Sequence, residues 1–258
     1  MFLEDENISQ AVFFPRKAEE PKDLDENIKV IKLKIHEDVI IGGILYLNDK
    51  SLPTILMFHG NGEIALDYQY FYEQYFECGV NLAVMDFRGY GFSSHKPTYM
   101  SLINDAMPIY EKFTEYREDI GLTNSLFIKG RSLGSVCAAE IGSHNPDLVN
   151  GMIFESSFAS VYNMMNRLFR IRGPNITPDI LQPYSNDTKA TKIQKPTLII
   201  HGTNDWIIPN SEGQLLYDSL PDNIYKRFIL IEGAGHNNIF SFTEEYFQPL
   251  EEFISRYK

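Results

Sequence analysis

One pentapeptide has the residue types and the setting of a nucleophilic serine. Gly130-Arg131-Ser132-Leu133-Gly134 matches the pattern G-x-S-x-G and lies between a strand-like run, SLFIK, and a helix-like run, LGSVCAAEIGS. A sharp strand-to-helix turn strains the backbone of its central residue, and small flanking residues make that strain tolerable. Such a turn would expose the Ser132 hydroxyl beside free N–H groups of the following helix. We therefore predict that Ser132 is a nucleophile; the alternative is a chance pentapeptide in a tight turn.

A serine hydroxyl is a weak nucleophile unless a base takes its proton, so a histidine should accompany Ser132. His236 is the best candidate, because it follows the apolar run RFILIEG within the glycine-rich segment GAGHNN. Loops at the carboxyl ends of parallel strands meet at one edge of a sheet, where ligands bind. The histidines with a less suitable position are His36, His95, His144 and His201. The predicted base is therefore His236.

The imidazole in turn needs a carboxylate, which fixes its tautomer and stabilises its cation. Asp205 fits this role because HGTNDWIIP directly follows the apolar run TLIIH and lies between the serine and the histidine in the chain. Glu155, at the end of the run GMIFES, is a competing acid from another strand end. The predicted order of the triad is Ser132, Asp205 and His236.

Acyl transfer also needs about two donors for the developing oxyanion. Leu133 follows the nucleophile, so its backbone N–H is one candidate. The second should come from the loop after TILMF, which reads HGNGE, because glycines let the backbone approach a substrate closely. We choose the N–H of Asn61, and we interpret His59 as a structural brace of this loop.

The elements that must position these residues can be identified from the pattern of apolar runs. Six short runs without apolar/polar alternation are typical of strands buried on both faces, and they are TILMFHG, NLAVMDF, SLFIKG, GMIFES, TLIIHG and RFILIEG. Helical spacing occurs between or after them at about 64–77, 99–120, 133–143, 211–219 and 242–257. Residues 28–47 predict a hairpin, and residues 1–28 predict a loose, extended lead-in. The fold class is therefore α/β, with an eight-stranded, mostly parallel sheet covered by helices on both faces.

The spacing of the strands breaks once, where about 40 residues separate Ile153 from Leu198. We expect one domain over residues 1–258, with a small lid insertion at about 156–193. The side chains expected to form an apolar wall for an acyl group are Met164, Met165, Leu168, Phe169, Trp206, Ile207 and Ile208. The lid residues among them could equally well just seal the lid onto the body. Arg131 would add a cation near the nucleophile and could face the cleft.

Charge and cysteine content exclude several classes of protein. With 23 basic and 35 acidic side chains the net charge is −12 and the pI about 4.9, so nucleic acid and anionic lipid are disfavoured partners. The two cysteines, Cys78 and Cys137, exclude a disulfide scaffold or zinc ribbon. The first residues are acidic, and no apolar run is long enough to cross a membrane. We expect a soluble, cytoplasmic protein without integral membrane association.

Five motifs stand in order along the chain, and they are HGNGE, DFRGYGFSS, GRSLG, HGTNDWIIP and GAGHNN. With them the sequence resembles the alpha/beta-hydrolase superfamily over nearly its whole length. It is similar to small bacterial serine esterases, which resemble the depalmitoylating thioesterases and the serine aminopeptidase group. The resemblance implies a Ser132-Asp205-His236 triad, no metal and no organic cofactor, and a structural role for Asp86–Gly91 at the base of the active-site loop. Arg131 departs from the uncharged or aromatic side chain of many relatives.

These observations predict a serine hydrolase, a carboxylesterase that cleaves small-molecule esters of short to medium acyl chains through an acyl-enzyme. Hydrolysis of acyl-thioesters or of small peptides and amides by the same triad is the alternative, because nothing in the sequence separates the leaving groups. A binding module that has lost turnover is a third possibility, against which the complete triad argues. The sequence leaves the oligomeric state open.

Overall fold

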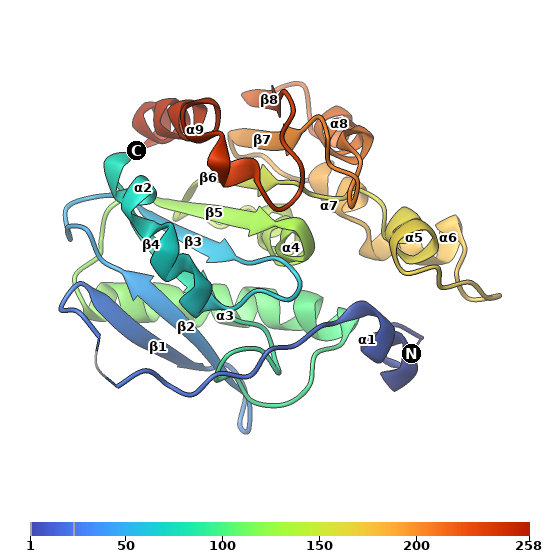
Figure 1. The fold of residues 1–258 in the computed structure, drawn as a ribbon, viewed down its shortest axis with the longest axis horizontal. Coiled ribbons are helices and arrows are strands. Elements are labelled where there is room, and N and C mark those ends of the chain that lie inside the picture. The colour runs from blue at the N-terminus through green and yellow to red at the C-terminus, as the bar shows by residue number, and fades with distance from the viewer. Residues whose placement is uncertain (1, 23) are drawn as a thin grey trace.

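The computed structural model describes residues 2–22 and 24–258, and a twisted sheet of eight strands runs through its middle (Figure 1). The strands are β1 (Ile28–Lys34), β2 (Ile40–Tyr46), β3 (Thr54–Phe58), β4 (Asn81–Met85), β5 (Leu126–Arg131), β6 (Val149–Glu155), β7 (Thr197–Gly202) and β8 (Lys226–Ile231). Their order across the sheet is β1-β2-β4-β3-β5-β6-β7-β8. Strands β3 to β8 pair in parallel, whereas β2 is antiparallel to both β1 and β4. The predicted eight-stranded, mostly parallel sheet and its opening hairpin are confirmed.

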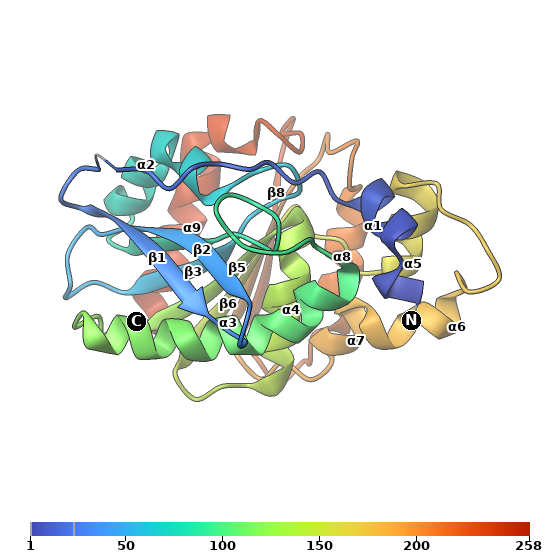
Figure 2. The same cartoon turned by 90° about the horizontal axis from the view of Figure 1, so that it is seen from below.

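The central strands are apolar throughout because helices cover both of their faces. Every residue of β3, β4, β5 and β7 is buried, which is the pattern of strands in a doubly covered parallel sheet. The helices are α1 (Glu6–Val12), α2 (Tyr72–Glu77), α3 (Tyr99–Asp119), α4 (Ser135–His144), α5 (Val161–Asn163), α6 (Pro178–Leu181), α7 (Asn186–Ala190), α8 (Asn210–Ser219) and α9 (Thr243–Tyr257). Helices α2 and α9 pack on one face, and α3, α4 and α8 on the other (Figures 1 and 2). No helix within residues 2–22 and 24–258 is long and apolar enough to cross a bilayer.

The chain between β6 and β7, where the lid is expected, forms short helical turns beside the body of the molecule. Helix α5 continues into a π-helical turn, Met164–Leu168, and α6 continues into a 3₁₀ turn, Gln182–Tyr184, before α7 returns the chain to the sheet. In both views α5 and α6 lie at the end of the molecule that also carries α1.

The prediction of a loose, extended lead-in over residues 1–28 is wrong for residues 2–12, which are largely helical, whereas residues 13–22 and 24–27 form neither a helix nor a strand; residues 1 and 23 lie outside the described residues. A 3₁₀ turn, Phe2–Glu4, precedes α1, and the Asp5 carboxylate caps α1 by accepting the N–H groups of Asn7 and Ile8. Val12 and Phe13 are almost fully buried in the core. The many charged residues of the segment face solvent. Because they make the segment polar overall, its composition does not reveal the short amphipathic helix.

Candidate active site

The turn at the end of β5 has the geometry that its two glycines predict. Ser132 has a φ of 49°, in the left-handed region that costs a residue with a side chain free energy. A Cβ atom at Gly130 would lie 2.6 Å from the Cα atom of Ser135, and one at Gly134 would collide with the backbone of Phe58. Only glycine fits at both positions, and the chain passes directly from Ser132 into a 3₁₀ turn and α4.

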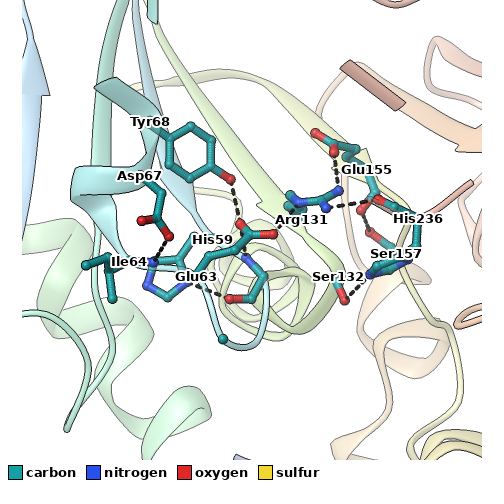
Figure 3. A network of polar contacts seen from close by, with 12 residues as sticks. His59, Glu63, Ile64, Asp67, Tyr68, Arg131, Ser132, Glu155, Ser157 and His236 are labelled. Carbon is teal, nitrogen blue, oxygen red and sulfur yellow. Dashed lines mark hydrogen bonds and ion pairs between the residues drawn. The ribbon is translucent and has the colours of Figure 1, made fainter. Parts of the chain in front are cut away.

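The structure brings the three predicted triad residues together from three separate strand ends. The Oγ atom of Ser132 lies 3.0 Å from Nε2 of His236, and Nδ1 of His236 lies 2.7 Å from Oδ2 of Asp205. Figure 3 shows Ser132 and His236 facing one another. All three side chains are nearly buried, which strengthens their mutual electrostatic interactions. This arrangement can transfer the serine proton to an imidazole whose cation is stabilised by a carboxylate.

Asp205 is held as a carboxylate by several donors. Its Oδ1 accepts the N–H groups of Ile207 at 3.0 Å and Ile208 at 2.8 Å. Burial alone would raise the pKa of Asp205, but hydrogen bonds from His201 and His236 outweigh this effect and keep the pKa well below its usual value. His201 is fully buried, with Nε2 3.4 Å from Asp205 and 2.9 Å from the carbonyl oxygen of Ile208. Sequence reasoning set His201 aside, and the structure shows it bracing the acid.

The remaining candidates for the base and the acid make other contacts. His36, His95 and His144 are exposed, and they pair with the carboxylates of Asp105, Asp38 and Glu140 respectively. Glu155 is buried against Lys129 and Arg131, so Asp205 is the acid placed on the imidazole of His236.

The two residues chosen for the oxyanion hole both line the cavity beside Ser132. The side chain of Asn61 is engaged in structure, because its Nδ2 donates to the carbonyl oxygen of Val12 at 2.6 Å and its Oδ1 accepts the hydroxyl of Tyr90 at 2.7 Å. The role predicted for Asn61 therefore rests on its backbone N–H, as does the role of Leu133. His59, fully buried between Asp86 and the carbonyl oxygen of Gly60, occupies the position expected of a brace.

A cavity of about 290 Å³ opens at Ser132 and His236, and most of its wall is apolar. It is lined by Phe14, Asn61, Ser132, Leu133, Phe158, Met164, Leu168, Phe169, Ile207, Ile208, His236 and Asn237. The expected wall residues that line the cavity are Met164, Leu168, Phe169, Ile207 and Ile208. Phe14 and Phe158 were missed, because nothing in their local sequence connects them with the motifs.

Three of the predicted substrate-binding residues are absent from this wall. Met165 is fully buried and packs into the core on the inner side of the π-helical turn. Trp206 is 91% exposed, since the tight turn that caps Asp205 directs it to solvent. The third is Arg131, whose predicted place at the cleft is corrected by its ion pairs.

The guanidinium of Arg131 lies below the elbow and joins several segments of the chain. Its Nε donates to Glu63 at 2.7 Å, its Nη1 to Glu155 at 2.6 Å, and its Nη2 to the carbonyl oxygen of His236 at 2.9 Å (Figure 3). Glu155 also pairs with Lys129 at 2.7 Å, so two cations and two carboxylates alternate, and all of them except the partly exposed Glu63 are buried. Each charge is compensated, which is the condition for keeping ions in an interior.

Glu63 connects this chain of ion pairs to the loop after β3. Its Oε2 accepts the N–H of Gly60 at 3.0 Å and the hydroxyl of Tyr68 at 2.9 Å. Burial would raise the pKa of Glu63, but the neighbouring cation of Arg131 outweighs it and lowers the pKa to about 2. Glu63 is thus ionised near neutral pH and holds residues 59–63 against the elbow. Within the described part of the chain, no three His, Cys, Asp or Glu side chains are grouped so that they could hold a metal ion.

Comparison with known proteins places this geometry in a family. The profile described as serine aminopeptidase, S33, matches residues 49–182 and 185–241, which is well over half of the chain. The chain belongs to this hydrolase family. Its matched region contains the serine elbow, the acid and the histidine, whereas residues 1–48 lie before it.

Curated relatives agree with the family. Protein bem46 of Schizosaccharomyces pombe is 26% identical over 251 residues, covering 94% of this chain and 83% of the relative. The human alpha/beta hydrolase domain-containing protein 17B is 28% identical over 209 residues, covering 79% of this chain and 66% of the relative. The chain thus spans slightly less than two thirds of the human protein.

Solved structures show the same fold. The Pyrococcus furiosus esterase Pf2001 superposes with a TM-score of 0.71 at 18% identity, over 89% of this chain and 90% of the esterase. Est1E from Butyrivibrio proteoclasticus has a TM-score of 0.67 at 15% identity, over 88% of this chain and 99% of its own. The alpha/beta-hydrolase fold expected from the sequence is confirmed.

Proposed function

We propose that this hydrolase is a carboxylesterase that cleaves small-molecule esters with short to medium acyl chains. The observation that carries the proposal is the hydrogen-bonded series Ser132, His236 and Asp205, with separations of 3.0 and 2.7 Å, at the base of an apolar cavity. A nucleophile, its base and the orienting acid are thereby in reach of one another next to a space for an acyl group.

The reaction follows from these positions. His236 takes the proton of Ser132 as Oγ attacks the ester carbonyl carbon, and Asp205 stabilises the resulting imidazolium. The N–H groups of Leu133 and Asn61 stabilise the oxyanion of the tetrahedral intermediate. His236 then gives the proton to the departing alcohol, which leaves an acyl group on Ser132. Water, deprotonated by His236, attacks this acyl-enzyme and releases the carboxylic acid.

The dimensions of the cavity support the range of acyl chains. Its 290 Å³ is at the small end of ligand pockets, which are about 300–1,000 Å³. Each buried methylene contributes about 0.8 kcal/mol until the chain reaches water, so kcat/KM should rise up to about fourfold per methylene and stop rising between about two and eight carbons. The position of Arg131 below the elbow removes a charge that would have opposed apolar chains.

Amide hydrolysis is the second candidate, because the family description names an aminopeptidase. Recognition of a free amino terminus would need a carboxylate on the cavity wall, and no Asp or Glu is among the described residues that line it. Acyl-thioesters need no such group and remain compatible with the same wall.

The test is a series of p-nitrophenyl esters from acetate to palmitate, measured beside acyl-thioesters and aminoacyl amides of matched size. We expect kcat/KM to be highest for the esters, with a maximum at eight carbons or fewer. A maximum at twelve carbons or beyond, or a preference for thioesters, would overturn the proposal in favour of a long-chain thioesterase. Labelling of Ser132 by a fluorophosphonate, which requires an activated serine, separates a hydrolase from a binding module.

A further inference from the structure

We propose that the N-terminal segment is a fixed wall of the substrate cavity, and that Phe14 determines how strongly the site favours longer acyl chains. The inference rests on the proposed esterase function and adds a specificity-determining residue to it. Phe14 lines the same cavity as Ser132 and His236, although more than a hundred residues separate it from either in the sequence. Its side chain is 60% exposed, so one side borders the cavity and the rest lies in solvent.

The backbone of Phe14 is tied to the loop predicted to supply the oxyanion hole. Its N–H donates to Oδ1 of Asn61 at 3.0 Å and is also 3.1 Å from the hydroxyl of Tyr90. Asn61 reciprocates by donating from Nδ2 to the carbonyl oxygen of Val12, at 2.6 Å. The amide of Asn61 thus clamps the chain on both sides of Phe13. Val12 and Phe13 anchor the clamp from beneath, because both are buried in the core.

A second set of contacts fixes the chain just after Phe14. Arg16 donates to the carbonyl oxygen of Gly62 at 3.1 Å and pairs with Asp67 at 2.5 Å. The backbone N–H of Gly91 donates to the carbonyl oxygen of Arg16 at 2.8 Å, and the N–H of Ala18 donates to the carbonyl oxygen of Gly91 at 3.0 Å. Phe14 is therefore held between two fastened stretches of backbone, which makes it a pre-organised part of the wall rather than a fraying end.

An exposed phenyl ring at a cavity mouth gains free energy when a substrate covers it. An acyl chain that lies along the cavity would bury the free side of Phe14 in proportion to its length, whereas an acetyl group is too short to do so. The contribution of Phe14 should therefore grow with chain length. Phe14 lies before residue 49, where the match to the family begins, so the matched region does not account for this preference.

The experiment compares Phe14→Ala with Trp206→Ala, using the ratio of kcat/KM for octanoate to that for acetate as p-nitrophenyl esters. Trp206 is a matched control, because it is an exposed aromatic residue near the site that does not line the cavity. We expect Phe14→Ala to lower the ratio about tenfold and Phe14→Leu to lower it less. Trp206→Ala should leave the ratio unchanged. An unchanged ratio in Phe14→Ala, or an equal fall in Trp206→Ala, would overturn the inference.

Failure of the inference is distinguishable from failure of the proposed function. A wild-type protein that hydrolyses none of the esters contradicts the esterase, and the wall is then tested by the labelling rates of Ser132 with fluorophosphonates of short and medium alkyl chains. A chain-length dependence that is weaker in Phe14→Ala than in the wild type supports the wall; identical dependence in the two proteins contradicts it. Circular dichroism confirms that each variant is folded.

Discussion

The side chains of Lys129, Glu155, Arg131 and Glu63 form a series of alternating charges beside the serine elbow, and all but Glu63 are buried. In contrast, Phe14 and Leu168 present partly exposed apolar side chains to the cavity at Ser132. The first region, called the floor here, joins the elbow, the loop after β3 and the loop of His236 through directional hydrogen bonds. The second, called the rim, consists of apolar cavity-lining side chains from the N-terminal segment, the lid and the loop after β7.

The difference shows that the floor fixes the geometry of the site, whereas the rim can adapt to the bound substrate. A buried ion network contributes little net stability compared with an apolar core, but it leaves a large penalty when one partner is removed. The ion pairs and hydrogen bonds of the floor can therefore form in few arrangements of the side chains. Apolar contacts of the rim are nondirectional, and each contributes a modest free energy to substrate binding. Substitutions in the floor should thus affect folding or turnover as a whole, and substitutions in the rim should alter the choice of substrate.

The largest effect should come from the residue at the boundary of the two regions. Ser132→Ala removes the proposed nucleophile, so kcat for ester hydrolysis should fall by about 10⁶-fold if the triad acts as a unit. The floor does not use the hydroxyl, and the melting temperature should stay close to that of the wild type. Steady-state kinetics and thermal unfolding of the purified variant check both statements. Hydrolysis at the wild-type rate would remove Ser132 from the reaction.

The next prediction contrasts two buried carboxylates. Asp205→Asn should lower kcat by about 10⁴-fold, because an amide does not hold the imidazole in the productive tautomer. Glu155→Gln should instead lower the free energy of unfolding by about 3 kcal/mol, because it leaves Lys129 and Arg131 incompletely compensated.

Denaturant unfolding and kcat, measured for both variants under the same conditions, give the comparison. If Glu155→Gln proved the more damaging to kcat per folded molecule, the acid of the triad would have to be reassigned to Glu155. Glu155, at the end of β6, would then belong to both the floor and the triad.

The two regions can be predicted from the sequence to different extents. The elbow, the acid and the histidine were found because each follows a strand run within a motif, and the order of strands brings their ends together. The floor was misread at Arg131, since a position beside the nucleophile does not tell whether a side chain turns toward the cleft or toward Glu63 and Glu155.

The rim was the least predictable part. Phe14 reaches the cavity only through tertiary contacts with Asn61 and Tyr90, which no local pattern encodes. Trp206 has the right neighbours in sequence, but hydrogen bonds from Ile207 and Ile208 to Asp205 form a turn that leaves it in solvent. Strand ends could thus be located from apolar runs, whereas the direction of single side chains could not.

A smaller effect concerns the floor in acid. Glu63 has a pKa of about 2 in the folded protein, against a usual value of 4.5, so its ionised form stabilises the fold above pH 4.5. That contribution, about 3 kcal/mol from the difference in pKa, should be lost as the pH falls toward 2. The free energy of unfolding should therefore differ most between wild type and Glu63→Gln near neutral pH, and the difference should shrink as the pH falls toward 2. A difference that stays constant between pH 6 and pH 3 would show that the charge of Glu63 does not stabilise the floor.

The smallest effect is expected at the lid side of the rim. Leu168 is 38% exposed and lines the cavity, so Leu168→Ala removes apolar surface without opening a void in the core. We expect kcat/KM for p-nitrophenyl octanoate to fall about threefold, the factor that corresponds to less than one covered methylene, and the melting temperature to change little. Ile180→Ala is the control, because Ile180 is similarly exposed on the lid but does not line the cavity. Equal losses in both variants would mean that the lid acts by general packing. A loss of a hundredfold or more would mean that Leu168 has the fixed, geometry-dependent character of the floor, and that the division between the two regions does not follow the type of side chain.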